Sequence, residues 1–377
     1  MRTEFSKFWE NNEAELYKTL KELCGIPAPS GLEDERAEYC KNKLTEFGAK
    51  GVYIDGAKNV IYPINAEKSD KLTVIVAHTD TVFPDTEPMP YSDDGEIIRC
   101  PGVGDDTASL AVLLFLAKYL NENGISAKNG LLLVCNSCEE GLGNLKGTRR
   151  LFEDYAGRIE RFVSFDSARL TNITNRCVGS VRYEVEVKTK GGHSYGAFGN
   201  KNAINHLSKI VNAIYGITVP KIEGEKTTYN VGTIEGGTSV NTIAQSAKML
   251  CEYRSTSSDA MDIMKKKFFD IFDSVRDTDV EVNVKVVGER PSAKGLDAEK
   301  QSELCKAVDA ARRRVIEGES TYSSGSTDCN IPLSLGIPAI AMGVYFGGGA
   351  HTREEWIEKS SLKPGLEIAI ETAIELI

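Results

Sequence analysis

The chain has 377 residues, 41% hydrophobic and 27% charged, with a formal net charge of −10. This is the composition of a globular protein with room for two domains, and its acidity argues against nucleic acid or an anionic membrane as a partner. The charged, amphipathic N-terminus does not resemble a signal peptide, and the longest apolar run, 110–117, is too short to cross a bilayer. Together with nine scattered cysteines, these features predict reduced thiols and a cytoplasmic location, with no membrane partner.

The first part of the chain predicts two helices and then an alternation of strands and helices. Near-helical spacing of large apolar residues predicts helices over 6–24 and 32–47, separated by a segment rich in Pro and Gly. Short, nearly all-apolar runs predict buried strands, and a further helix lies between the first two. The expected strands are 72–77, 131–135, 162–165 and 340–344, and the helix is 109–120. This order predicts an α/β domain with a mostly parallel sheet covered on both faces.

The pattern changes in the middle of the chain. Polar and apolar residues alternate in 181–187 and 280–287, which predicts strands with one solvated face. Further strands are expected at 231–234 and 247–253, and helices at 202–215 and 259–273. The order β-α-β-β-α-β is that of a ferredoxin-like domain. Because the α/β pattern resumes near Ser302, we expect a larger domain in two parts, 1–177 and 292–377, interrupted by a smaller domain at 178–291.

Imidazole and carboxylate side chains stand where the expected strands end. In a parallel sheet the carboxyl ends of the strands meet at one edge, so these side chains are expected to converge there. They are of the types that bind divalent metals, and two metals roughly 3.5–4 Å apart can activate a water for hydrolysis. The candidate ligands are His78, Asp105, Glu140, Asp166 and His351. Glu139, beside Glu140, is left as a general base for that water.

The roles of neighbouring acidic residues are less clear from the sequence. In the doublet Asp105-Asp106, one carboxylate can bridge two metals while the other caps the following helix. We expect Asp105 to bridge and Asp106 or Thr107 to cap. Asp80 lies two residues after His78 and is expected to orient its imidazole by accepting the second ring N–H. Each of these residues alone could be structural, and their joint occurrence is what predicts a two-metal site.

Two other patterns are weaker. Cys135 and Cys138 form a CxxC pair, but Cys135 lies inside an expected strand and no second CxxC occurs in the sequence. The glycine-rich segment 141–147 follows a strand as a dinucleotide-binding loop would, but its last glycine is one residue late. Neither a redox pair nor an NAD site is therefore predicted.

The motifs AHTDT (77–81), GDD (104–106), the EE doublet, FDS (165–167) and AHTREEW (350–356) occur in this order along the chain. Taken jointly they resemble the M20 family of metallopeptidases and deacylases, and the resemblance covers nearly the whole length. It implies a zinc-binding α/β domain split by a smaller lid or dimerisation domain, and hence a homodimer through that domain. It implies that His78 and Asp166 bind one metal, that Glu140 and His351 bind the other, and that Asp105 bridges them. It also implies that Asp80 orients His78 and that Glu139 is the base.

Two divalent ions are thus the implied cofactors. Zinc is expected, while cobalt and manganese stay open because the ligands are all nitrogen and oxygen.

The resemblance also implies substrate-binding residues. His193, in GGHSYG, would help to bind the substrate carbonyl oxygen, from its own or a partner subunit, and Asn241, in GGTSVNTIA, would contact substrate. Arg254, in EYRS, would bind a substrate carboxylate, for which its planar guanidinium is suited. Ser326, in GSTDCN, would line the substrate loop. The chain departs from many relatives in having Thr107-Ala108 after the Asp doublet and Ala244 where proline is common.

The identity of residue 166 indicates a branch of the family. Aspartate there is common among aminopeptidase and tripeptidase-like members, and glutamate among carboxypeptidases and N-acyl deacylases. The resemblance therefore implies an exopeptidase that cleaves short peptides from the amino end. An N-acyl amino acid deacylase or a carboxypeptidase of the same family is the alternative, and a binding protein on an inactive hydrolase fold is a third reading.

Overall fold

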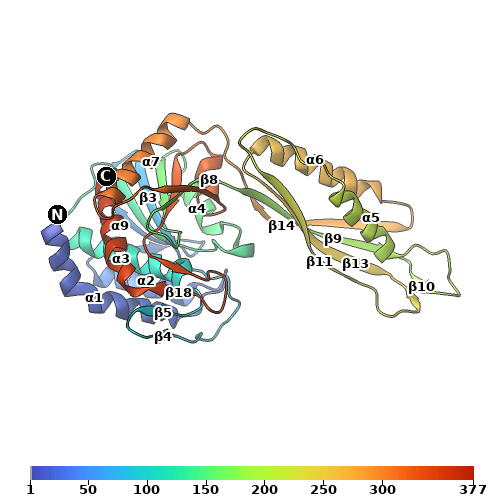
Figure 1. Cartoon of the computed structure of the whole chain (residues 1–377), viewed down its shortest axis with the longest axis horizontal. Helices are drawn as coiled ribbons and strands as arrows, with labels where there is room; N and C mark the ends of the chain where they lie inside the picture. Colours follow the sequence, from blue (N-terminus) through green and yellow to red (C-terminus); the bar gives the residue numbers. More distant parts are fainter. Residues whose placement is uncertain (1) are drawn as a thin grey trace. The chain divides into compact units, whose positions relative to one another are not determined.

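The computed structural model describes residues 2–377 (Figure 1). The chain divides into two compact units, one formed by the chain up to Cys177 together with Lys294–Ile377, the other by Val178–Ala293. The second unit is therefore an insertion in the sequence of the first. None of the helices within residues 2–377 combines the length and apolarity needed to cross a membrane.

The larger unit is built on an eight-stranded sheet in the order β1-β2-β6-β3-β7-β16-β8-β15. Its central strands β6, β3, β7 and β16 run parallel, whereas β1, β2 and β8 join by antiparallel pairings. The mostly parallel sheet expected from the sequence is therefore confirmed. The strands are β1 (Tyr53–Ile54), β2 (Val60–Ile64), β3 (Leu72–His78), β6 (Gly130–Asn136), β7 (Ile159–Ser164), β8 (Asn172–Cys177), β15 (Thr321–Gly325) and β16 (Ala339–Met342).

Helices cover both faces of this sheet because its central strands are apolar on both sides. In β6, Leu131 and Leu133 face the main core, which α1, α2, α3 and α9 complete, and Leu132 faces the opposite side. On that other side, Phe152 of α4 packs against Phe162 of β7. The helices are α1 (Arg2–Cys24), α2 (Asp34–Glu46), α3 (Ser109–Glu122), α4 (Lys146–Asp154), α7 (Ala298–Arg313), α8 (Asn330–Ser334) and α9 (Leu362–Leu376).

A second, small sheet joins two distant loops of the same unit. Its order is β17-β18-β5-β4, and β18 pairs antiparallel with β5. The strands are β4 (Ser92–Asp93), β5 (Ile97–Arg99), β17 (Gly347–Gly348) and β18 (Trp356–Glu358). The loop between β17 and β18 contains His351, and the segment after β5 leads to Asp105. The sheet therefore brings these two segments side by side.

The start of α3 differs from the expectation. Neither Asp106 nor Thr107 caps it. Ala108 occupies the capping position without a side-chain hydrogen bond, and the preceding turn over Val103–Ala108 is kinked, with non-helical backbone at Asp105 and Asp106. The Asp106 carboxylate instead accepts the backbone N–H of His78 at 3.0 Å. The capping role predicted for Asp106 or Thr107 is therefore wrong, because the Asp106 carboxylate is engaged by β3 instead.

The inserted unit has the expected ferredoxin-like order. Its four long strands form an antiparallel sheet in the order β11-β13-β9-β14, and α5 and α6 pack on one face. In β9 the residues Val181, Tyr183 and Val185 face the helices, as the alternating pattern predicts. The elements are β9 (Gly179–Thr189), α5 (Ala203–Tyr215), β11 (Thr227–Gly236), β13 (Ser246–Ser255), α6 (Ser258–Ser274) and β14 (Val280–Arg290). Two short strands, β10 (Gly192–His193) and β12 (Thr242–Ile243), pair with each other.

Candidate metal centre

Three parallel strands end at the same level and carry the candidate ligands there. His78 is the last residue of β3 and pairs in register with Asn136, the last residue of β6. Glu139 and Glu140 are the third and fourth residues after β6, and Asp166 lies two residues beyond β7. Because these strands are neighbours and parallel, their side chains meet at one edge of the sheet.

The five candidate ligands form two groups that share Asp105. In the first group, ligand atoms of His78, Asp105 and Asp166 lie within 4.8 Å of one another, and in the second those of Asp105, Glu140 and His351 do so. His78 Nε2 is 3.0 Å from Asp105 Oδ1, while His351 Nε2 is 3.1 Å from Asp105 Oδ2 and 3.0 Å from Glu140 Oε1. Each oxygen of Asp105 thus faces a different imidazole, which is the arrangement that a bridging carboxylate requires.

The second ring nitrogen of His78 has two neighbouring oxygens, both from Asp80. The nearer is the main-chain carbonyl of Asp80, 3.0 Å from Nδ1, and a carboxylate oxygen of the same residue lies at 3.5 Å. A ring N–H donated to either oxygen fixes the imidazole with Nε2 toward Asp105. Asp80 therefore holds this ring mainly through its main-chain carbonyl. Its carboxylate makes its shorter contacts with other groups.

The charges of the cluster perturb its members strongly. Burial alone would lower the pKa of His78, but the charge of Asp106 and hydrogen bonds to Asp105 and Asp80 raise it well above its usual value. Hydrogen bonds to Asp105 and Glu140 raise the pKa of His351 to about 11. The surrounding carboxylates therefore favour the doubly protonated, positively charged form of both imidazoles.

Asp105 and Asp166 respond in opposite directions. Burial would raise the pKa of Asp105, but its hydrogen bonds with His351 and His78 outweigh burial and hold the pKa well below its usual value. Burial and the nearby charge of Asp105 raise the pKa of Asp166 to about 7. The two imidazoles thus stabilise the charge of Asp105, whereas Asp166 has burial and a neighbouring negative charge against its ionised form.

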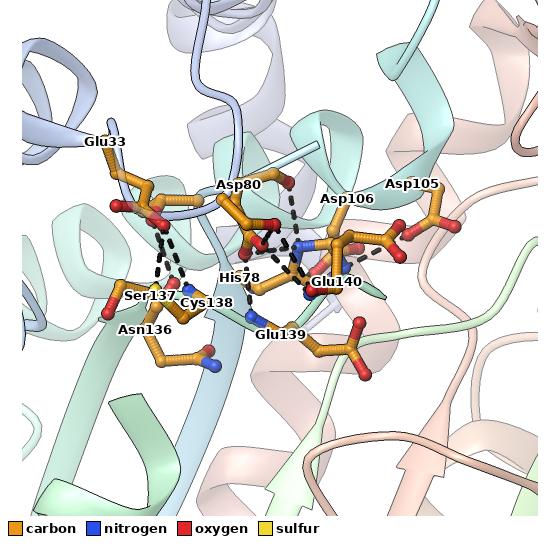
Figure 2. A network of polar contacts seen from close by, with 12 residues as sticks. Glu33, His78, Asp80, Asp105, Asp106, Asn136, Ser137, Cys138, Glu139 and Glu140 are labelled. Atoms are coloured by element: carbon orange, nitrogen blue, oxygen red, sulfur yellow. Dashed lines mark hydrogen bonds and ion pairs between the residues drawn. The ribbon is translucent and has the colours of Figure 1, made fainter. Parts of the chain in front are cut away.

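The carboxylate of Asp80 organises the loop that carries the two glutamates (Figure 2). Its Oδ1 accepts the backbone N–H of Glu139 and its Oδ2 that of Glu140, each at 2.9 Å. Ser30 donates its hydroxyl to Asp80 Oδ2 at 2.6 Å and to the Glu140 carbonyl at 3.2 Å. Figure 2 shows the side chains of Glu139 and Glu140 diverging from this loop, with Glu140 beside Asp105. The two carboxylates thus take different directions, although ligand atoms of Glu139, Glu140 and His78 also lie within 4.8 Å of one another.

Glu355 plays the corresponding part for the segment that carries Asp105. It is buried, and its carboxylate accepts backbone N–H groups from Gly102 at 2.6 Å, Gly104 at 3.0 Å and Asp105 at 2.7 Å. A side chain at position 104 would meet Glu355 Oε1 at 2.9 Å, so glycine is required for this close approach. Because Glu355 follows His351 by four residues, it ties the two ligand-bearing loops together.

Asp328 is a further buried carboxylate behind the cluster. It accepts a hydrogen bond from Asn136 Nδ2 at 2.5 Å and another from the hydroxyl of Thr148. Burial raises its pKa, and the charge of Asp80 adds to the effect. The contact joins the loop after β15 to the end of β6.

Sequence reasoning missed these supporting residues, which are Ser30, Asn136, Asp328 and Glu355. Asp328 and Glu355 lie inside motifs singled out for Ser326 and His351, so their position was a usable signal. Ser30 lies in a segment that was read only as a helix break, and its polar partners could not be inferred without the fold.

The expected substrate-binding residues are divided between the two units. In the inserted unit, His193 and Asn241 lie close together, because β10 pairs with β12 and the Ser194 N–H is donated to the Asn241 carbonyl at 3.0 Å. His193 Nδ1 accepts backbone N–H groups from Tyr195 and Gly196 at 3.3 and 3.2 Å, so its proton is on Nε2. The ring therefore offers an N–H donor at its exposed tip.

The other two expected substrate residues have less definite surroundings. Arg254 lies on β13 and forms a two-pronged contact with Glu252 at 2.8 and 3.1 Å, so its guanidinium is already paired within the inserted unit. Ser326 lies in the larger unit, partly buried, in the loop directly after β15. These positions leave both roles as proposals.

A family model supports the resemblance described above. Residues 74–375 match the model of peptidase family M20/M25/M40. The match covers most of the chain and includes every candidate ligand, so the chain belongs to this family. It is accordingly a metal-dependent hydrolase of the metallopeptidase type.

Individual relatives are distant but match almost the full length. The uncharacterized protein YqjE of Bacillus subtilis is 24% identical over 95% of this chain and 97% of its own. A putative succinyl-diaminopimelate desuccinylase DapE of Mycobacterium tuberculosis is 24% identical over 92% of this chain and 94% of its own. These identities support a common fold and leave the substrate open.

Solved structures agree on that fold. Aminopeptidase PepT from Bacillus cereus has a TM-score of 0.75 at 22% identity, covering 97% of this chain and 99% of its own. A tripeptidase from Staphylococcus aureus has a TM-score of 0.76 at 22% identity, covering 96% and 97%. The YXEP protein of Bacillus subtilis, described as a dinuclear metal-binding peptidase of the M20 family, has a TM-score of 0.69 at 16% identity, covering 97% and 99%.

Proposed function

We propose that this protein is a two-metal exopeptidase that removes residues from the amino end of short peptides. The observation that carries the proposal is the sharing of Asp105 between two ligand groups, His78 with Asp166 and Glu140 with His351. The donor set suits two divalent ions, since each group combines one imidazole with carboxylates and the ligand atoms already lie within one coordination shell of each other. Zinc fits this mixture of nitrogen and oxygen donors, and cobalt and manganese are the rivals.

The residues around the ligands supply the remaining chemistry. Bound metals would polarise the scissile carbonyl and lower the pKa of the attacking water. Glu139 accepts the proton of that water and returns it to the leaving amine. Asp80 keeps Glu139 and Glu140 in place through their backbone N–H groups. We further propose that the exposed Nε2–H of His193 and the amide of Asn241 bind substrate, with Arg254 and Ser326 in secondary roles.

Replacement of Glu139 by Gln tests the role of the base. The variant should bind the same quantity of metal as the parent protein and lose about 10²–10⁴-fold in kcat, because Gln cannot take the proton. Metal content is measured by elemental analysis and kcat on the same preparation. Loss of metal in proportion to activity would show that Glu139 is a ligand rather than a base.

Two observations support an amino-end peptidase. Aspartate at position 166 is common in the aminopeptidase branch of the family, and this chain shares its fold with PepT and the tripeptidase. The specific rival is an N-acyl amino acid deacylase, favoured by the likeness to a putative desuccinylase. Metal-loaded protein should therefore be assayed on a free-amino tripeptide, the same tripeptide acetylated at its N-terminus, and an N-acetyl amino acid. Cleavage of only the free-amino tripeptide supports the proposal, whereas turnover of only the blocked substrates assigns the protein to the deacylases.

A further inference from the structure

Glu33 is a further buried carboxylate of the larger unit that lies outside the ligand groups. Glu33 directly precedes α2, where a polar side chain would ordinarily cap the helix, yet its side chain makes no capping hydrogen bond. The side chain is fully buried, and the nearest cation, Lys58 Nζ, is 3.9 Å from Oε2. Burying a carboxylate without a close ion pair costs free energy. We therefore expect Glu33 to make contacts that serve a particular role in the structure.

The contacts of Glu33 are with the loop that follows β6. Its Oε1 accepts the backbone N–H of Cys138 at 3.2 Å, lies 3.2 Å from the Cys138 thiol sulfur, and accepts the backbone N–H of Gly31 at 2.7 Å. Figure 2 shows Glu33 reaching this loop from the side opposite Asp105. A single oxygen of Glu33 therefore joins the segment before α2 to the residue that directly precedes Glu139.

Cys138 is in an uncommon conformation. Its φ is 57°, in the left-handed region that a side chain with a Cβ rarely adopts without support. Its N–H is taken by Glu33, and the next two N–H groups, of Glu139 and Glu140, are taken by Asp80. Three consecutive backbone donors are thus held by two buried carboxylates. A return of Cys138 to an ordinary conformation would rotate the following peptide and move the Glu139 side chain.

We propose that Glu33 is a positioning residue for the general base, holding Cys138 in its left-handed conformation so that Glu139 faces the reacting water. The inference rests on the proposed function for its kinetic consequence, but the conformational step stands on the contacts of Glu33 alone. Glu33 binds the loop at Cys138, next to Glu139, while Asp80 accepts the backbone N–H groups of Glu139 and Glu140. Loss of Glu33 should therefore affect Glu139 more than the metal ligands.

The test compares Glu33→Ala and Glu33→Gln with the parent protein. Glu33→Ala should lower kcat by about 10–100-fold, the effect of a displaced reacting group, with KM changed less than about threefold. Bound metal, and the visible spectrum of the cobalt-loaded protein, should not change. Glu33→Gln should keep kcat within about threefold, because its amide oxygen can accept the same N–H groups. Asp34→Ala, an exposed neighbour that also contacts Lys58, is the matched control and should behave like the parent protein.

Amide hydrogen exchange provides a readout that does not depend on turnover. In Glu33→Ala the amides of residues 138–140 should exchange faster than in the parent protein, and in Asp34→Ala they should not. If the parent protein cleaves none of the three substrates, the proposed function fails, and the exchange measurement still decides whether Glu33 holds the loop. Should Glu33→Ala not fold, Glu33→Asp, which withdraws the acceptor by one methylene, takes its place with the same expectations.

Two results would overturn the inference. The first is a folded Glu33→Ala with parental kcat and parental exchange at residues 138–140. The second is loss of metal in step with loss of activity, which would place the effect on the ligands instead of the base.

Discussion

Removing the Glu355 carboxylate should weaken metal binding although Glu355 is not itself a candidate ligand. Its two oxygens accept three backbone N–H groups, from Gly102, Gly104 and Asp105, at 2.6–3.0 Å. Glu355→Ala leaves these donors without an acceptor in a buried place. Since each such loss costs about 1–3 kcal/mol, the variant should be destabilised by about 3 kcal/mol or more. For a unit of this size the thermal midpoint should fall by about 6 °C or more.

The effect on the metals follows from the position of Asp105. Glu355 accepts the N–H of this residue directly, so the bridging carboxylate loses its fixed backbone, and metal affinity should fall by about 10–100-fold. Competition with a chromophoric chelator measures the affinity, and calorimetry measures the midpoint. Glu354→Ala is the matched control, because that neighbouring side chain is exposed. An unchanged metal affinity in a destabilised Glu355→Ala would refute the reasoning and leave Glu355 with a purely structural role.

Two further outcomes follow from the same geometry. Because the pKa values of His78 and His351 lie above their usual range and that of Asp166 is about 7, the metal-free site holds protons at pH 7 that bound metals must displace. Metal affinity should therefore rise with pH, and titration calorimetry in buffers of different ionisation enthalpy should detect release of about two protons, whereas no release would contradict the assignment. Replacement of Asp80 by Asn places an amide N–H against the N–H of Glu139 or Glu140, and should lower kcat by about 10–100-fold. Ser30→Ala, which removes one hydrogen bond to Asp80, should have a smaller effect in the same assay, and equal effects would argue against Asp80 as the main support.

The central elements were predictable from sequence because burial on both faces leaves a simple pattern. The runs that became β3 and β6 are apolar at nearly every position, and β9 alternates as a half-buried strand must. The edge strands were missed for the opposite reason. β1 has two residues, and β15 (TYSSG) is largely polar, so neither carries a periodic signal. Such strands form because a neighbouring strand offers unpaired backbone groups, which the sequence does not display.

The candidate ligands and their supports differ in the same way. His78, Glu140 and Asp166 could be singled out because they are polar residues at the ends of apolar strands. Glu33 could not, since its main hydrogen-bond donors are backbone N–H groups, which nearly every residue has. The reading of Asp106 as a helix cap failed for a related reason, because its true partner is the N–H of His78. Sequence patterns reveal which side chains are unusual in their place, but not which main-chain donors the fold leaves without partners.

The backbone contacts also explain how so many carboxylates share one small volume. Those of Asp80, Glu33 and Glu355 each accept hydrogen bonds from two or three backbone N–H groups, which are neutral donors and add no mobile positive charge. They therefore leave the negative potential at the ligand groups largely in place. The pKa of Glu355 is nonetheless raised to about 7, by burial and by the charge of Asp105, which shows that the repulsion is not fully relieved. Divalent ions between the ligands would relieve it, so metal binding and stability of the larger unit should be coupled through these outer carboxylates as well as through the ligands themselves.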